Sequence, residues 1–130
     1  MKLAKEKNSE NPVYYVSYAY ARIYSILNDY EDTVEVNDYG CIKNNDTARL
    51  LNVTSRFPEV VLNAASKELH HLITNYVYEL ASCFHSFYSK HKIIVDDKEI
   101  LKDNLNIIKA VKITIKNALD LIGVVSPEKM

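Results

Sequence analysis

Two tyrosines and an arginine lie at helical spacing near the start of the chain. Tyr15, Tyr18 and Arg22 are separated by three and four residues, so a helix would align them along one side. An aromatic stripe of this kind usually belongs to the packing of a core, with the arginine a solvated charge. The same groups also suit another chemistry, because phenol rings stack on unpaired nucleic-acid bases and a guanidinium binds base edges. The spacing alone leaves both interpretations open.

A group of lysines near the end of the chain could also bind a ligand. Lys109 and Lys116 lie seven residues apart, with Lys112 between them, so a helix would bring the three ammonium groups to one side. A solvated polar face is the more common explanation of such a pattern, and contact with RNA phosphates is the alternative. The three lysines are therefore candidates for phosphate contact.

Residues suited to metal binding or catalysis are few and scattered. Glu68 and His71 have the Glu-x-x-His spacing of half a di-iron site, but such a site needs a second copy and the sequence has none. Cys41 and Cys83 lack metal-type spacing and are expected to be reduced thiols. The sequence also lacks a Gly-rich phosphate loop. We therefore expect no metal site, no catalytic residue and no cofactor in this chain.

The composition is typical of a single globular domain. The chain has 130 residues, 48% of them hydrophobic and 25% charged, and its formal net charge is −1. No apolar run approaches the ~18 residues that span a bilayer, and the N-terminus lacks the apolar core of a signal peptide. We expect a monomeric protein of the cytoplasm that does not contact membranes.

Hydrophobic periodicity predicts an all-α bundle of about five helices, two of them short. Two glycines and three prolines provide little turn punctuation for a β fold. The first helix is expected to begin at Pro12, with Asn11 as its N-cap, and to end near residue 28. Residues 29–45 combine acidic and turn-forming residues and are expected to form an acidic surface loop.

Two short helices are expected next. The first would be capped by Asp46 or Thr47 and would bury Leu50, Leu51 and Val53. The second would begin at Pro58. Its inward-facing positions are predicted to be Val61, Leu62 and Ala65.

Two long helices complete the predicted bundle. One covers about residues 68–90, with a continuous apolar stripe that begins at Leu69 and ends at Phe87. The other covers about residues 98–122, and Gly123 suits the position directly after it. Residues 93–95, a β-branched run, are expected to form an extended connector between them.

Several segments resemble one known domain family. The opening run Asn-Pro-x-Tyr-Tyr-Val-x-Tyr-Ala-x-Ala-Arg-Ile, residues 11–23, resembles the first helix of the DALR anticodon-binding domain of arginyl-tRNA synthetases, which are class I aminoacyl-tRNA synthetases. Residues 3–5 and 10–12 resemble the segment that leads into this domain. Further similar segments, in the same order, are Phe57-Pro58-Glu59-Val60-Val61, Tyr76-Val77-Tyr78-Glu79-Leu80-Ala81, Phe84-His85-Ser86-Phe87-Tyr88 and residues 118–130.

The resemblance implies a role in tRNA recognition. By position, it places anticodon contacts at Tyr15, Tyr18, Arg22, Tyr88 and the terminal Met130. These groups would hold splayed bases of the anticodon loop of arginine tRNAs, with the middle base, a cytosine, as the main identity element. The partners implied are the tRNA and the catalytic domain of a parent arginine–tRNA ligase. Residues 1–10 would be a linker stub or tail, and residues 11–130 the domain.

The resemblance also separates this chain from the chemistry of its parent. The catalytic motifs of the parent class are absent, so aminoacylation, with its ATP and Mg²⁺, would belong to the parent enzyme only. The chain departs from the family pattern at Ser17, where glutamine is usual, at Tyr20, where histidine is usual, and at Asn104, where arginine is frequent.

Three alternatives remain. The chain could be an anticodon-type domain of another synthetase of the same subclass, or the related domain of the glycyl enzyme's β-subunit. It could also be an α-helical protein-interaction module whose aromatic stripe binds a partner helix. A small metal-dependent enzyme is the last alternative.

Overall fold

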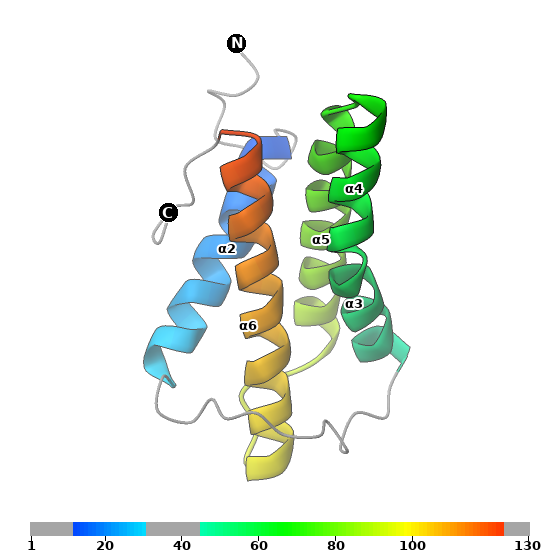
Figure 1. Cartoon of the computed structure of the whole chain (residues 1–130). Coiled ribbons are helices and arrows are strands. Elements are labelled where there is room, and N and C mark those ends of the chain that lie inside the picture. The colour runs from blue at the N-terminus through cyan, green and yellow to red at the C-terminus, as the bar shows by residue number, and fades with distance from the viewer. Residues whose placement is uncertain (1–11, 31–44, 124–130) are drawn as a thin grey trace.

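The computed structural model describes residues 12–30 and 45–123. They form five helices, and no strand occurs in these two ranges (Figure 1). The helices are α2 (Pro12–Asp29), α3 (Asn45–Ser55), α4 (Phe57–Lys67), α5 (His71–Lys90) and α6 (Lys98–Leu121). The predicted all-α fold is therefore confirmed. Residues 1–10 and most of the predicted acidic loop lie outside the described residues, as does Cys41.

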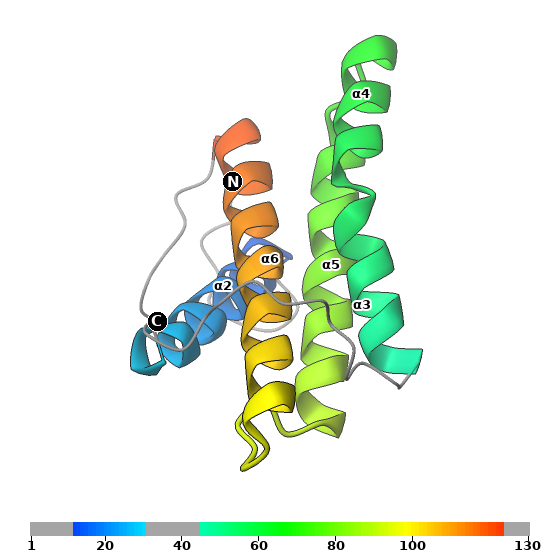
Figure 2. The same cartoon turned by 60° about the horizontal axis from the view of Figure 1, so that its bottom comes forward.

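The five helices form four columns, because α3 and α4 follow one another with only Arg56 between them. Figure 1 shows α3 and α4 as one column beside α5. Figure 2 shows α2 crossing the other helices rather than running alongside them. The central helix is α5, which packs against α2, α3, α4 and α6. None of the described helices is long and apolar enough to cross a membrane.

The core is built from the apolar stripes of α2, α5 and α6. Its largest side chains with no exposed surface include Ile23, Leu80, Phe84, Leu105 and Ile108. These residues repeat every three or four positions on their helices, as the sequence predicts for helices that bury one side. Burial of an apolar side chain of this size contributes about 1.5–3 kcal/mol to stability, before conformational entropy is counted.

Polar contacts fix the ends of the long helices. The Asp97 carboxylate accepts hydrogen bonds from the backbone N–H groups of Glu99 and Ile100, at 3.0 and 3.3 Å, and caps α6 at the predicted place. The Asn104 amide donates to the backbone oxygen of Ile93 at 3.0 Å, which attaches the connector to α6. Gly123 follows α6 with a φ of 77°, a left-handed conformation that favours glycine.

Tyr76 joins α5 to the column beside it. Its hydroxyl donates to the backbone oxygens of Val53 and Thr54, at 2.6 and 3.1 Å. Burial raises the pKa of Tyr76 to about 12, so the hydroxyl keeps its proton for these bonds. The two carbonyls belong to the last turn of α3, where helical partners run out.

The predicted start of α5 was wrong by three residues. α5 begins at His71, not at Glu68, because Glu68 adopts a left-handed conformation with φ 56° and ends α4. Its backbone N–H bonds to the carbonyls of Ala64 and Ala65. Leu69 consequently lies in the turn and is exposed, so it does not begin the apolar stripe of α5.

The inward face predicted for α4 was also wrong. Ala64 is buried, with 2% of its surface exposed, whereas Leu62 is 67% exposed and Ala65 is exposed. Phe57 and Val60 pack against the core on the same side as Ala64. The true stripe is thus one position earlier than the predicted one, a rotation of about 100°. The sequence pattern failed here because α4 packs mainly on one helix, α5, and buries only a narrow line of residues.

We expect Ala64 and Ala65 to respond very differently to the same substitution. Ala64→Asp should lower the free energy of unfolding by roughly 3 kcal/mol or more, because it buries an unpaired carboxylate. Ala65→Asp should cost less than about 1 kcal/mol, which is the difference in helix propensity. Urea denaturation followed by circular dichroism measures both. Equal losses for the two variants would show that the register of α4 described here is incorrect.

Candidate nucleic-acid interface

The predicted stripe of α2 meets α5 in a cluster of rings around one guanidinium. The Arg22 guanidinium carbon lies 4.6 Å from the Tyr18 ring centroid and 4.4 Å from the Tyr88 ring centroid. Arg22 Nη2 also donates to the Tyr18 hydroxyl. Tyr18 and Tyr88 are 36% and 38% exposed, so both rings reach the surface. We call Tyr15, Tyr18, Arg22, His85 and Tyr88 the Arg22 cluster.

His85 lies beneath the exposed rings. Its ring centroid is 4.6 Å from that of Tyr15 and 5.7 Å from that of Tyr18. His85 Nε2 donates to the backbone oxygen of Tyr15 at 3.4 Å. Burial lowers the pKa of His85, the Tyr15 carbonyl opposes this shift, and the positive charge of Arg22 adds to it. The imidazole is thus neutral at pH 7 and supports the tyrosines without placing a second cation beside Arg22.

Sequence reasoning missed His85 as a member of this cluster. The sequence places it in the family-like run of residues 84–88 but assigns it no role. Its spacing of three residues from Tyr88 was the available signal, because residues at that spacing share one side of a helix.

The other predicted anticodon contacts differ in accessibility. Tyr15 is half-buried, packs against the core and lies 5.1 Å from Tyr78 between ring centroids. Its position suits support of the outer rings better than contact with a ligand. Met130 lies outside the described residues. Ser17 and Tyr20, two of the departures from the family pattern, are buried on α2 and do not belong to the cluster.

The three candidate lysines lie on another flank. The Lys112 ammonium is 4.9 Å from the Tyr24 ring centroid, on the side of α2 that faces α6. Tyr24 is two residues from Arg22, so the two side chains point about 200° apart around α2. Lys116 Nζ lies 3.2 Å from a carboxylate oxygen of Asp120, and Lys109 is exposed. Their contact with phosphate stays a prediction, but it would involve a face away from the Arg22 cluster.

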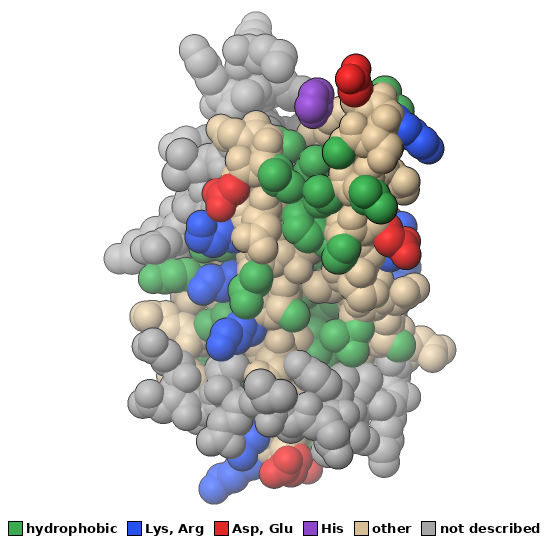
Figure 3. All heavy atoms as spheres, viewed as in Figure 1, with side chains coloured by type: hydrophobic (Ala, Val, Ile, Leu, Met, Phe, Trp, Pro, Cys, Tyr) green, Lys and Arg blue, Asp and Glu red, His purple; other side chains and the backbone are tan. Residues whose placement is uncertain are grey.

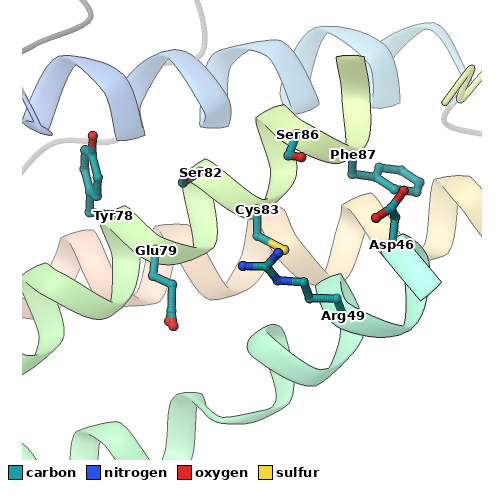
Figure 4. A pocket seen from close by; sticks show the side chains of 8 residues that line it. All are labelled: Asp46, Arg49, Tyr78, Glu79, Ser82, Cys83, Ser86 and Phe87. Carbon is teal, nitrogen blue, oxygen red and sulfur yellow. The ribbon is translucent and has the colours of Figure 1, made fainter. Parts of the chain in front are cut away.

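A cavity between α3 and α5 does not bring together a catalytic set. It has a volume of about 400 Å³, and Figure 4 shows Arg49 beside Cys83 while Tyr78 points toward α2. Burial raises the pKa of the Cys83 thiol, which keeps it protonated and poorly nucleophilic. Both carboxylates that line this cavity have partners: Asp46 pairs with His91 at 2.9 Å and Glu79 pairs with Arg56.

The structure also shows where the candidate metal-binding residues lie. Across residues 12–30 and 45–123, no group of three or more His, Cys, Asp or Glu side chains is placed to hold a metal ion. Glu68 and His71 are both exposed.

The neutral state of His85 predicts a pH dependence of stability. Its pKa in the folded state lies below the ordinary value of 6.5, so the unfolded chain binds the proton more readily. The contribution of neutral His85 to the free energy of unfolding is therefore complete above about pH 6.5 and is lost as the pH falls below that value. The His85→Gln variant should lose less free energy of unfolding than wild type between about pH 7.5 and about pH 5.5, as measured by urea denaturation. His70→Gln, at an exposed position, is the control and should retain the wild-type dependence. Identical curves for wild type and His85→Gln would contradict the assignment.

Comparison with known proteins agrees with the fold and with the resemblance. The sequence profile of the DALR anticodon binding domain matches residues 16–130. Arginine–tRNA ligases of Bacillus pumilus and Staphylococcus aureus are each 46% identical to the chain over 134 aligned residues, covering 98% and 100% of it. The chain spans only 24% of the length of these relatives.

Solved structures show the same arrangement of helices. A Campylobacter jejuni structure assigned as an arginyl-tRNA synthetase matches 99% of the chain with a TM-score of 0.86 and 29% identity, over 29% of its own length. Arginyl-tRNA synthetase of Thermus thermophilus matches 95% of the chain with a TM-score of 0.83 over 22% of its length. At 24% identity, the second likeness shows the fold alone. Because the family profile covers most of its residues, the chain belongs to the DALR anticodon binding domain family.

Proposed function

We propose that this chain binds the anticodon loop of arginine tRNA and positions the tRNA for arginylation by a catalytic domain that the sequence does not contain. The observation that carries the proposal is the Arg22 cluster, in which two exposed phenol rings flank one guanidinium. Unpaired bases offer a π-face to such rings and hydrogen-bond acceptors to the guanidinium. Membership of an anticodon-binding family supports the same use.

The aminoacylation reaction is proposed only for a longer parent protein. The relatives named arginine–tRNA ligases are about four times as long as the segment they share with this chain. ATP and Mg²⁺ would be bound by the rest of the parent, because the given sequence has no Gly-rich phosphate loop and the described residues offer no metal-ligand cluster. We place the parent in the cytoplasm, as the sequence led us to expect.

An exposed apolar face favours a further partner, the rest of the parent polypeptide. Figure 3 shows hydrophobic side chains gathered over the upper parts of α6, α5 and α4. Leu62 on α4 and Leu121 on α6 are 67% and 56% exposed. Apolar surface of this kind commonly marks a site of contact. The extra length of the relatives supplies an occupant, so a separate protein partner is not required.

The central test measures binding of the anticodon stem-loop of an arginine tRNA by fluorescence anisotropy at low salt. Tyr88→Ala should weaken binding by about 1–3 kcal/mol, the usual contribution of one base–aromatic stack. Arg22→Ala should weaken binding and should also reduce discrimination between cytosine and uracil at the middle anticodon base. Both variants should keep the wild-type helical spectrum, because both side chains reach the surface.

The matched control is Arg56→Ala, which removes a guanidinium from the junction of α3 and α4. Its partner Glu79 is on the surface, so this change should leave both folding and stem-loop binding nearly unchanged. If wild type binds and neither Arg22→Ala nor Tyr88→Ala differs from Arg56→Ala, the Arg22 cluster is not the binding site.

The exposed leucines of α4 and α6 lead to a separate prediction. Leu62→Gln combined with Leu121→Gln should leave stem-loop binding unchanged and should reduce any self-association at high protein concentration. The physical reason is that both leucines present exposed apolar surface, which favours association between copies of the chain. Light scattering after size-exclusion chromatography measures association. A loss of stem-loop binding in this double variant would instead assign the face to RNA.

A further inference from the structure

A cavity of about 410 Å³ opens beside the Arg22 cluster, between the end of α2 and the connector that follows α5. Tyr88 belongs to both, because Arg22 lies 4.4 Å from its ring centroid and the same side chain lines the cavity. The cavity walls also include Ile26 from α2, Lys90 from the end of α5, and Lys92 and Ile94 from the connector. The two sites are therefore continuous across one aromatic ring.

The far wall of the cavity is held in place by specific bonds. The Asn104 amide donates to the backbone oxygen of Ile93, as described above, and the His91 backbone N–H donates to Phe87 O at 3.0 Å. His91 Nε2 donates to Asp46 at 2.9 Å. These bonds tie the connector to α6, α5 and α3, so the cavity does not depend on a loose segment.

The chemistry of the cavity is apolar at its walls and basic at its rim. Ile26 is half-buried and Ile94 is exposed, and both offer aliphatic surface. Lys90 and Lys92 are exposed, and neither ammonium forms an ion pair with the residues that the structure describes. The nearby carboxylate of Asp46 is already paired with His91. An aliphatic wall with a cationic rim suits a base or sugar attached to a phosphate.

We propose that this cavity is a second nucleotide subsite, which takes the anticodon-loop nucleotide adjacent to the one held by the Arg22 cluster. The base or sugar packs against Ile26 and Ile94, and the phosphate lies at Lys90 or Lys92. The volume is at the lower end of the range for small-ligand pockets, which suits one nucleotide rather than a folded segment. The proposal rests on the proposed function, since it names where the neighbouring nucleotide goes.

The test compares anticodon stem-loops in which one loop nucleotide at a time lacks its base. Wild type should lose affinity at two adjacent loop positions, one for each subsite. Ile94→Ala should weaken binding of the intact loop by roughly five- to tenfold, and it should remove most of the effect of the missing base at only one of those two positions. Tyr88→Ala should reduce the effect of the missing base at both positions, because its ring is shared.

The lysines are tested through salt dependence. The double variant Lys90→Ala and Lys92→Ala should bind the intact loop more weakly, and its plot of log Kd against log salt should be shallower by about one phosphate contact or more. Lys67→Ala, an exposed lysine at the end of α4, is the control and should keep the wild-type slope.

The outcomes separate the two proposals. If wild type binds no stem-loop, the proposed function fails. If wild type binds and Tyr88→Ala weakens binding, but Ile94→Ala and the double lysine variant match Lys67→Ala, the second subsite is overturned and the proposed function stands. All variants are first compared with wild type by circular dichroism, and none replaces a buried side chain.

Discussion

The burial of α5 against four other helices is the constraint on which the rest of the structure depends. Val77, Leu80 and Phe84 on this helix are at most 1% exposed. Successive residues of a helix point about 100° apart, so burial of Phe84 also fixes where His85 and Tyr88 point. The Tyr88 ring lies 6.0 Å from that of Phe84 and emerges where α2 crosses α5. The core therefore sets the direction of the candidate interface.

The state of His85 determines which charge the Arg22 cluster presents. Burial keeps the imidazole neutral, so the guanidinium is not repelled by a cation beneath it. The ring of His85 instead fills the space between Tyr15 and Tyr18, and its bond to Tyr15 O joins α5 to α2. Groups held in place before a ligand arrives lose less conformational freedom on binding. This arrangement suits a surface that must hold flexible single-stranded bases.

Local sequence signals were sufficient where one helix decides its own limits. α2 begins at Pro12, α6 begins at Lys98, and Gly123 follows the end of α6, all as predicted. They were insufficient for the turn between α4 and α5. There Glu68, a residue without glycine's freedom, adopts a left-handed conformation that no composition rule indicates. The inward face of α4 was missed for a related reason, since its burial depends on where α5 lies.

The sequence by itself determined that Tyr15, Tyr18 and Arg22 share one side of a helix, and its motifs indicated the family. It also named Tyr88, but only through resemblance. The tertiary structure decided that Arg22 lies between Tyr18 and Tyr88, that His85 lies beneath them, and that Lys112 faces Tyr24 on another flank. The physical reason is that periodicity fixes directions around one helix axis. Contacts between residues far apart in the chain depend on the crossing of α2 and α5, which is set by packing of the whole core.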